Sequence, residues 1–386
     1  MKLTLDFRRV AIIGGVAAGI VAVAALLIVL AGASPLDGLR GLVEGVSSSP
    51  YRFGELLVGT VPIAIIALTL IPALRAGVFS VGAEGQVTIG AITATAGIFG
   101  LQNAFGDAVP APVYLVCGAV CGAIGGGAYA LLPALLAVRW NVNEILSTLL
   151  LNYVATGILG WSLRTWLASG ENTATPQSAL FPESAALPTL IAGTRAHWGL
   201  VLVVIIAAAL MWWQRTSNSA RLTVFASRPK LARRLGTTRA RTIYSTMLVS
   251  GLGAGLVGWI QVSGINDRLM GSVAGGVGFS GIAVALLGAL VPSGIVVAAL
   301  FFSALAAGAL GMQSATGSVP TSIAEVIKGV ILLGVACIAA VQKKPAAIVA
   351  PTAEPAATDD DPAGAGSGTS AAVEDHIGIG ESEQQR

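Results

Sequence analysis

The 386-residue chain is 55% hydrophobic and only 11% charged, and its net charge is +3. Soluble globular domains are roughly 45–50% apolar and about 25% charged, so this composition excludes a water-soluble domain. The small net charge also argues against a nucleic-acid-binding protein. The apolar residues form runs of about 20 residues, the length of an α-helix that crosses roughly 30 Å of hydrocarbon. We therefore predict an all-α polytopic membrane protein.

The sequence predicts about ten membrane-embedded helices. The first, 10–31, is too long for the apolar part of a signal peptide, so we expect it to be retained as a span. Two glycine-interrupted segments, 77–99 and 275–290, are candidates for broken or re-entrant helices. Their comparable positions before and after a basic linker indicate an internal repeat of two halves. The remaining segments are 53–74, 112–138, 145–168, 197–213, 242–262, 295–311 and 321–342.

The basic residues predict the orientation, because Lys and Arg favour cytoplasmic connections. Arg75 follows the second segment, Arg139 follows the fourth, and the linker 215–241 contains basic but no acidic residues. With ten crossings these positions fall on one side, so both termini are predicted to be cytoplasmic in a multi-pass protein of the plasma membrane. The opposite side receives the connections 32–52, 169–196 and 263–274.

The sequence predicts two regions of different character. Residues 1–342 are expected to form one transmembrane domain, in which 215–241 is a basic cytoplasmic linker. Residues 343–386 are rich in Ala, Pro, Gly, Ser and acidic residues and lack apolar periodicity, which predicts a disordered acidic tail in the cytoplasm. For this tail an inert solubilising role is favoured over a specific function.

No catalytic set is visible in the sequence. The chain has only two histidines, His197 and His376, and it lacks a Walker-type phosphate loop and the HExxH and CxxC patterns. Its cysteines lie in apolar runs, which favours packing over a disulfide or a metal site. We therefore predict no enzymatic activity, no cofactor and no metal. If the protein drives uphill transport with ATP, another chain must hydrolyse it. The cysteines are Cys117, Cys121 and Cys337.

The stretch "VGAEGQVTIGA" places a carboxylate and an amide, Glu84 and Gln86, in an apolar region. Polar groups within spans are costly and usually face a cavity or another helix. Gly82 and Gly85 flank the carboxylate, which indicates a break in a helix, where freed backbone groups need partners or line a cavity. Three interpretations of Glu84 remain open: a structural clasp that holds the break, a position on a translocation path, and simple exposure at the cytoplasmic end.

Further polar positions allow both a structural and a functional interpretation. Asn143 and Glu144 are suited to cap the start of a helix, and Asn152 lies about two turns farther along. The glycine run 251–258 favours helix packing over substrate contact. In the last segment, Glu325 and Lys328 have the i, i+3 spacing of an ion pair near the membrane interface.

The middle of the linker, "FASRPKLARRLGTTRART", predicts a short helix from about Pro229 to Gly236. Proline is common at the start of a helix and glycine just past its end. Charge alone leaves two roles open for this linker. It is either a positively charged anchor of the topology or a docking helix for an ATPase.

Four stretches together resemble the integral-membrane permeases of ABC importers for branched-chain amino acids, simple sugars and nucleosides. "AGVFSVGAEGQVTIGA" looks like the family signature, with Ser80 and Val81 in place of the usual Asn-Ile pair. "NEILSTLLLNYVA", with Asn152 and Tyr153, and "GGVGFSGIAVALLGALVPSG", with Phe279, are similar to the nucleoside branch, which is linked to basic membrane lipoproteins. "VPTSIAEVIKGVILL" resembles the last span of that branch. The likeness runs from about residue 50 to 342.

The linker also resembles the coupling segment of this family. Pro229, Ala232 and Gly236 fit its pattern, and Arg233 and Arg234 are further candidates for contact with the ATPase. Four positions depart from the pattern, so the individual contacts with the ATPase are not specified by the resemblance. They are Ala226, Arg228, Leu231 and Thr237.

The resemblance implies a permease subunit that imports nucleosides across the plasma membrane. Its implied partners are a second permease, with a different homologous chain favoured over a second copy, a cytoplasmic ABC ATPase and an extracytoplasmic substrate-binding lipoprotein. The same machine carrying simple sugars such as ribose is the first alternative. An ion-gradient-driven secondary transporter is the second, and the lack of carboxylates near mid-membrane argues against it. Candidates for the pathway or the substrate site are Glu84, Gln86, Asn143, Asn152, Tyr153 and Phe279.

Overall fold

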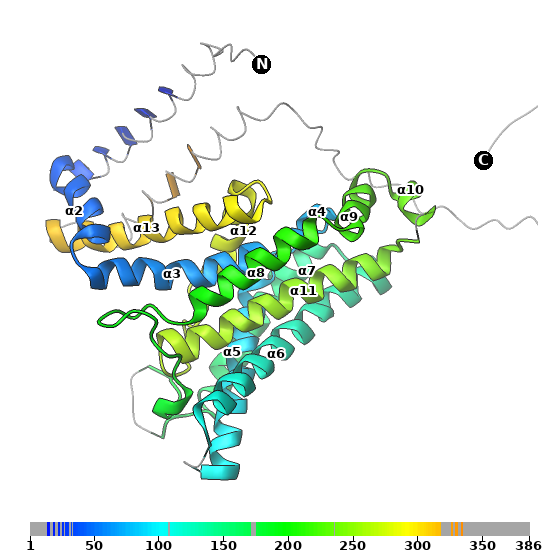
Figure 1. Cartoon of the computed structure of the whole chain (residues 1–386), viewed down its shortest axis with the longest axis horizontal. Helices are drawn as coiled ribbons and strands as arrows, with labels where there is room; N and C mark the ends of the chain where they lie inside the picture. Colours follow the sequence, from blue (N-terminus) through cyan, green and yellow to red (C-terminus); the bar gives the residue numbers. More distant parts are fainter. Residues whose placement is uncertain are drawn as a thin grey trace, which may run out of the picture. The chain divides into compact units, whose positions relative to one another are not determined.

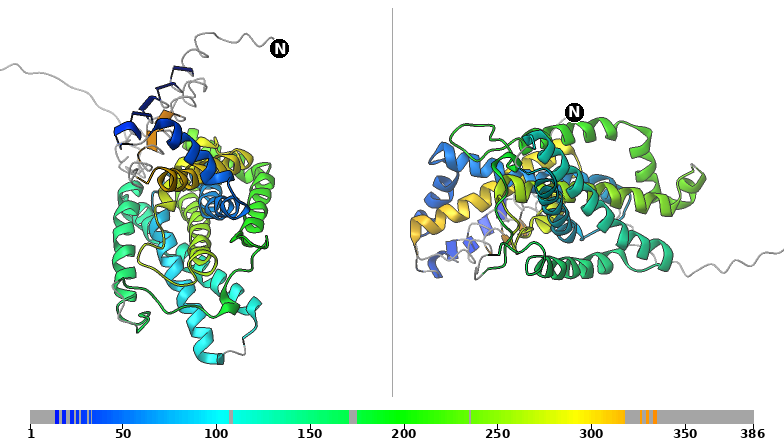
Figure 2. Two further views of the ribbon diagram at one scale, coloured as in Figure 1. Left: turned by 90° about the vertical axis from the view of Figure 1, so that its left-hand side faces the viewer. Right: turned by 90° about the horizontal axis from the view of Figure 1, so that it is seen from below.

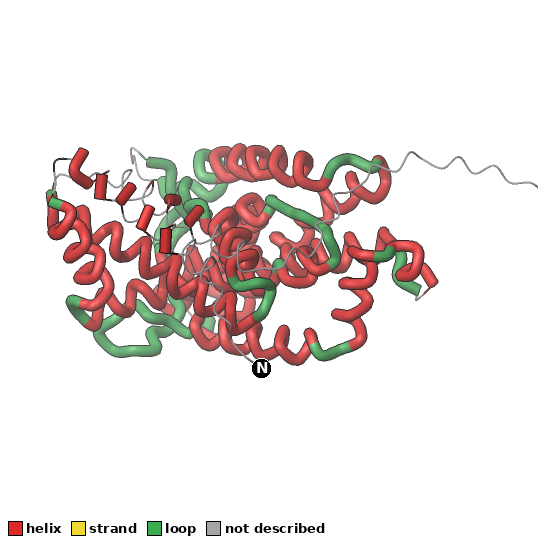
Figure 3. The backbone as a smooth tube through the Cα atoms, turned by 90° about the horizontal axis from the view of Figure 1, so that it is seen from above, coloured by secondary structure: helices red, strands yellow, loops and turns green. Residues whose placement is uncertain are grey.

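The computed structural model describes residues 34–106, 109–170, 175–234 and 236–317, with scattered positions between 14 and 32 and between 326 and 334. The chain divides into the units 1–344 and 345–386, and all described residues belong to the first. These residues form helices and loops and no β-strand (Figure 3). The predicted all-α class is therefore confirmed. The predictions for 10–31, for 321–342 with Glu325 and Lys328, and for the tail 343–386 lie largely or wholly outside the described residues.

Twelve α-helices follow one another along the described residues. In chain order they are α2 (Pro35–Ser47), α3 (Pro50–Thr69), α4 (Ile71–Arg75), α5 (Ala83–Phe105), α6 (Ala111–Trp140), α7 (Glu144–Ser162), α8 (Gly199–Gln214), α9 (Ser217–Ser227), α10 (Pro229–Arg234), α11 (Arg239–Ile260), α12 (Val277–Leu287) and α13 (Pro292–Thr316) (Figure 1). A π-helical turn, η3 (Gln261–Ile265), continues α11, and a short 3₁₀ turn, η2 (Glu183–Ala185), lies before α8.

Five helices of the described residues are long and apolar enough to cross a membrane, and a sixth is obtained if α8 and α9, bent by 72°, count as one span. Two of the ten predicted membrane-embedded segments, 77–99 and 275–290, are not among these spans. Helix α5 begins only at Ala83, after the non-helical stretch 76–82, and α12 has 11 residues, too few to cross the hydrocarbon alone. The five helices that are long and apolar enough to cross a membrane are Pro50–Arg75, Ala111–Trp140, Glu144–Ser162, Arg239–Ile265 and Pro292–Thr316.

Helix α2 was not expected from the sequence, which predicts 32–52 as a connection. It packs along α13, which also lies against α3 (Figure 2). A Cβ atom added to Gly41 would lie 2.7 Å from the Met312 Cα, and one added to Gly45 would lie 2.7 Å from the Ala307 carbonyl oxygen. The charges of α2 lower its hydropathy, whereas its glycines allow this close helix packing. A hydropathy pattern therefore does not reveal it.

Glycines also set the packing of α5, α6 and α11. A Cβ atom added to Gly90 of α5, or to Gly126 of α6, would lie 2.5 Å from the Gly255 Cα of α11. Such distances leave no room for a side chain, so the three backbones are in direct contact. The prediction that the glycine run 251–258 serves helix packing is confirmed.

The connections gather at two opposite ends of the helices. At one end, the connection between α7 and α8 pairs with the stretch after η3, where the Ser178 N–H donates to the Leu269 carbonyl (2.9 Å). At the other end, the Arg75 guanidinium donates to the Ser219 hydroxyl (2.8 Å) and Arg239 donates to the Asn141 side-chain oxygen (2.6 Å). Ser178, Phe181 and Leu187 of the connection 169–196 thus pair with residues of 263–274. The sequence predicts that these two connections share a side.

His197 is buried in the α7–α8 connection, two residues before α8 begins. Its Nδ1 accepts a hydrogen bond from the Gly199 N–H (3.1 Å), so the proton of the neutral ring lies on Nε2. Nε2 has no hydrogen-bond partner among the described residues. Burial, and to a lesser degree the charge of Arg195, lowers the pKa of His197 to about 4. The ring is therefore neutral at pH 7.

Candidate functional site

The candidate site is built around the break that precedes α5. We call this region the α5 junction; it consists of the non-helical stretch 76–82 and the first turn of α5, 83–86. Gly77 has a φ of +74°, a conformation that other residues rarely adopt, and it lets the chain turn out of α4. The four leading N–H groups of a helix have no intrahelical partner. The junction therefore needs acceptors from elsewhere in the fold.

Glu84 connects the junction to α12. Its Oε1 accepts a hydrogen bond from the Gly276 N–H (2.7 Å) and its Oε2 accepts one from the Gly278 N–H (2.8 Å). Gly276 is the residue before α12, with a φ of +81°. Carboxylates are stabilising at helix N-termini, where the unpaired N–H groups and the helix dipole present positive charge. Glu84 is thus a clasp between two helix ends, the first of the three interpretations that the sequence leaves open.

The two helix ends touch through their backbones. A Cβ atom added to Gly278 would lie 2.7 Å from the Glu84 Oε2 and 2.8 Å from the Glu84 Cα. Any larger residue at this position would separate the ends or displace the carboxylate. The carboxylate consequently lies between the N-terminus of α12 and that of α5, in whose first turn it occurs.

Helix α7 holds the junction from another direction. The Asn152 side chain accepts a hydrogen bond from the Gly85 N–H (2.9 Å) and donates one to the Val81 carbonyl (3.0 Å). One turn earlier, the Thr148 hydroxyl oxygen accepts a hydrogen bond from the Val81 N–H (3.2 Å). Asn152 and Thr148 are buried. Together they satisfy backbone groups that the break in the helix leaves free.

Gln86 is the unsatisfied member of the site. Its side chain is only 1% exposed, and its Oε1 has no hydrogen-bond partner among the described residues. Leaving a buried acceptor unpaired costs about 1–3 kcal/mol. This oxygen is therefore a buried acceptor of the junction whose hydrogen bond the described residues do not supply.

Two aromatic candidates lie on the helices that hold the junction, with their side chains at the surface of this chain. Tyr153 follows Asn152 on α7 and is 73% exposed, and Phe279 follows the capped end of α12 and is 47% exposed. Asn143 is not part of the junction. It caps α7, where its Oδ1 accepts hydrogen bonds from the Ile145 and Leu146 N–H groups (2.9 and 3.3 Å), which is the structural role that the sequence left open.

The structure adds three residues that sequence reasoning did not single out, Thr148, Gly276 and Gly278. Thr148 lies four residues before Asn152, so the two share one face of α7. That spacing was a signal in the sequence. The two glycines carried no comparable signal, because their partner Glu84 is almost 200 residues away.

The predicted linker helix is present as α10, Pro229–Arg234. Ala232 is buried, whereas Arg233 and Arg234 are exposed. Gly236, with a φ of +76°, ends the helix, and its N–H donates to the Arg233 carbonyl (3.0 Å). The sequence positions of proline and glycine thus predicted both limits of this helix.

Helix α9 connects this linker to the junction. Leu222 and Phe225 pack against the cluster that contains Val78 of the junction. A Cβ atom added to Gly77 would lie 3.4 Å from the Ala226 Cβ, which is ordinary van der Waals contact. With the Arg75–Ser219 hydrogen bond, these contacts place α9 directly on the segment that leads into α5.

The known proteins that this chain resembles are all permease components of transporters. Residues 53–336 match the family described as "Branched-chain amino acid transport system / permease component". The chain is 30% identical to the glucose ABC transporter permease protein TsgB13 of Haloferax volcanii, over 81% of this chain and 83% of that protein. It is 30% identical to the guanosine ABC transporter permease protein NupP of Bacillus subtilis, over 85% and 91%.

A third relative, the nucleoside ABC transporter permease protein NupB of Lactococcus lactis, is 27% identical over 81% of this chain and 86% of that protein. No solved structure gives a significant match. The family match covers most of the chain, and the apolar helices agree with a multi-pass protein of the plasma membrane. The chain therefore belongs to the family of permease components of branched-chain amino acid transport systems.

Proposed function

We propose that this chain forms half of the translocation pathway of an ATP-driven ABC importer for nucleosides. The observation that carries the proposal is the clasp of Glu84 at the start of α12. It supports a polar unit in the membrane domain, in which two helix ends are joined and must move together. The pathway runs beside the α5 junction, between this chain and a second, homologous permease.

The charge at the junction favours an uncharged solute. Helix N-termini bind anions because of their free N–H groups and their positive dipole end. Here Glu84 already occupies the N-terminus of α12, so a substrate phosphate or carboxylate would meet a negative charge. Nucleosides and sugars are neutral and lack this conflict.

A nucleoside also fits the side chains near the junction. A base needs a flat apolar surface and a few hydrogen-bonding groups. Phe279 and Tyr153 offer exposed rings. The amide oxygen of Gln86 is unpaired but buried, so it reaches a base only when the junction opens. A simple sugar is the second candidate, since sugars also stack on aromatic rings and the glucose permease relative is as similar as the guanosine permease relative.

Each partner protein is assigned to one end of the helices, according to the elements that lie there. We place the basic end, with α9 and α10, in the cytoplasm, together with both termini. There α10 docks on an ABC ATPase through Arg233 and Arg234, while the α7–α8 connection faces an extracytoplasmic substrate-binding lipoprotein. Movement of α10 on ATP binding shifts α9 and, through Val78 and Gly77, the α5 junction.

Uptake experiments test the proposal. Radiolabelled adenosine, uridine and ribose are offered to cells with and without this gene, and with and without depletion of ATP. Loss of ATP-dependent nucleoside uptake alone supports it. Loss of ribose uptake instead moves the substrate to sugars, and uptake that follows the proton gradient and ignores ATP overturns it.

A further inference from the structure

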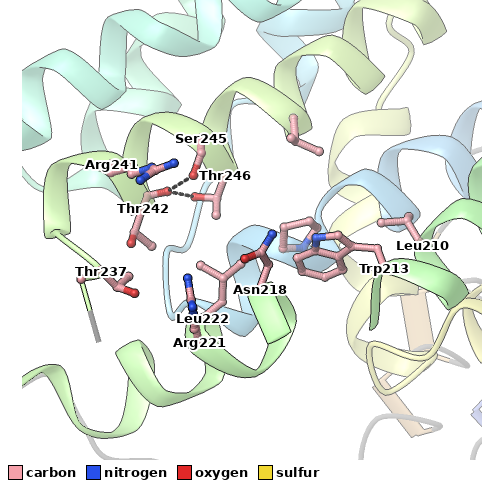
Figure 4. Close-up of a pocket in the computed structure, with 13 residues that line it drawn as sticks. Leu210, Trp213, Asn218, Arg221, Leu222, Thr237, Arg241, Thr242, Ser245 and Thr246 are labelled. Atoms are coloured by element: carbon pink, nitrogen blue, oxygen red, sulfur yellow. Dashed lines mark hydrogen bonds between the residues drawn. The ribbon is translucent and has the colours of Figure 1, made fainter. Parts of the chain in front are cut away.

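A pocket of about 380 Å³ lies at the basic end of the helices, between α8, α9 and α11 (Figure 4). Its polar side is formed by Arg221 of α9 and Arg241 and Thr242 of α11, among others. Its apolar side includes Leu210 of α8 and Val249 of α11. The pocket therefore has two chemically different ends, and neither belongs to the α5 junction.

The polar end is suited to an anion. Arg221 and Arg241 have no ion-pair or side-chain hydrogen-bond partner among the described residues, and no acidic residue lines the pocket. Figure 4 shows Arg221 extending from α9 toward α11, where Thr242 lies. Guanidinium groups bind phosphate oxygens through paired, charge-assisted hydrogen bonds. The pocket thus offers two guanidinium groups from different helices, with no acidic residue in its lining.

The apolar end of the pocket reaches the surface of this chain. Val249 is 39% exposed. Trp212, at the end of α8 and beside the pocket residue Trp213, is 73% exposed. Exposed tryptophans at the end of a membrane helix mark the level of the lipid headgroups. The phosphate-binding end is therefore at headgroup level, and the apolar end continues toward the hydrocarbon.

We propose that this pocket binds an anionic phospholipid, with the phosphate at Arg221 and Arg241 and an acyl chain along Leu210 and Val249. Basic pockets between helices on the cytoplasmic side are suited to lipid headgroups. A free phosphate or a nucleotide would use the arginines and leave the apolar end unfilled. The bound lipid bridges α9 and α11, and so stiffens the segment on which the linker helix α10 is carried.

The experiment uses the full-length protein in its permease complex, purified in phosphatidylcholine nanodiscs. Phosphatidylglycerol is titrated in, and its binding is measured by native mass spectrometry and by the melting temperature. We expect preferential binding of phosphatidylglycerol over phosphatidylcholine and a rise in melting temperature. In the double variant Arg221→Ala, Arg241→Ala, this binding should fall about tenfold or more, because two charge-assisted contacts are lost.

The matched control is Arg139→Ala with Arg228→Ala, which removes the same charge from exposed positions at the same end but outside the pocket. An equal loss in both double variants overturns the proposal in favour of general surface electrostatics. Val249→Trp fills the apolar end and keeps both arginines. It should also lose the lipid, and unchanged binding in this variant, if it melts normally in phosphatidylcholine, overturns the proposal.

A further arm separates the two sources of phosphate. Inorganic phosphate and AMP are added to the complex in phosphatidylcholine alone. A stabilisation by either that depends on Arg221 and Arg241 shows a site for a soluble phosphate and overturns the lipid assignment. Stabilisation by phosphatidylglycerol alone supports it.

Discussion

The Glu84 carboxylate accepts a 2.8 Å hydrogen bond from the backbone N–H of Gly278, which fixes the first turn of α5 to the first turn of α12. The two residues are 194 positions apart in the sequence. The two glycine-interrupted segments that the sequence places in separate halves of the chain are thus in direct contact. A displacement of either helix end must act on the other.

Replacing Glu84 by Ala should destabilise the protein and abolish uptake. The change leaves the N–H groups of Gly276 and Gly278 without acceptors, and a hydrogen bond to a charged group contributes about 1.5–3 kcal/mol. We expect a lower melting temperature in detergent and loss of substrate uptake in cells.

Gly278→Ala tests the same contact from the other helix, because its Cβ would lie 2.7 Å from the Glu84 Oε2. Gly271→Ala is the control, since a Cβ there meets nothing within 4 Å. Normal melting and normal uptake of Glu84→Ala would contradict the clasp. So would equal melting temperatures and equal uptake of the two glycine variants.

The neighbours Asn152 and Tyr153 should behave differently. Asn152→Ala leaves the Gly85 N–H and the Val81 carbonyl without their partners, at a cost of about 2–3 kcal/mol. Tyr153→Ala removes an exposed ring and should leave the melting temperature unchanged. If Tyr153→Ala nevertheless raises the KM for nucleoside uptake, the ring contacts substrate. Unchanged melting of Asn152→Ala would show that α7 does not hold the junction.

The stability of the chain should decrease below neutral pH because of His197. Its pKa is lowered to about 4 in the folded protein, whereas the unfolded chain takes up the proton near pH 6.5. Protonation therefore favours the unfolded state as the pH falls from about 6.5 to 4, with a loss that approaches about 3 kcal/mol. Chemical denaturation at several pH values measures this slope.

His197→Asn provides the control for this slope. Its side-chain oxygen can accept the Gly199 N–H in place of Nδ1, and it does not titrate in this range. The variant should lose most of the pH dependence between 4 and 6.5. A slope equal to that of the unmodified protein would assign the effect to other groups.

Charge reversal on α10 should weaken association with the ATPase. Arg233 and Arg234 are exposed on a helix whose buried residue, Ala232, holds it against the fold. Arg233→Glu with Arg234→Glu should reduce the ATPase that co-purifies, while the melting temperature stays unchanged. The control is Arg139→Glu with Arg215→Glu, which makes the same charge change at exposed positions of the same end but outside α10. Equal co-purification in both double variants would remove α10 from the docking surface.

Local patterns in the sequence predicted much of the architecture. The length of the apolar runs indicated α3, α6, α8, α11 and α13, because a helix that crosses hydrocarbon needs about 20 apolar residues in succession. Pro229 and Gly236 marked the limits of α10, because each residue restricts or frees its own backbone. The glycine run 251–258 indicated close helix packing for the same reason, since the absence of a side chain is a property of the residue itself.

Other features depended on which segments meet in space. Helix α2 is stabilised by contact between Gly41 and α13, and its own hydropathy does not indicate a membrane helix. Likewise, the exposure of Tyr153 and the burial of Asn152 follow from which face of α7 meets the junction. Adjacent residues can therefore have opposite environments, and here the polar amide is buried while the aromatic ring is exposed, which a one-dimensional pattern does not predict.

The sequence by itself determined that this chain is a helical membrane protein of a permease family, with a polar break near Glu84. Composition and periodicity are properties of the local sequence, so they can be recognised without knowledge of the tertiary structure. Only the tertiary structure decided which groups Glu84 contacts. The free N–H groups of α12 and the carboxylate of Glu84 satisfy one another because folding brings the two helix ends together, and a hydrogen bond depends on distance in space rather than on separation along the chain.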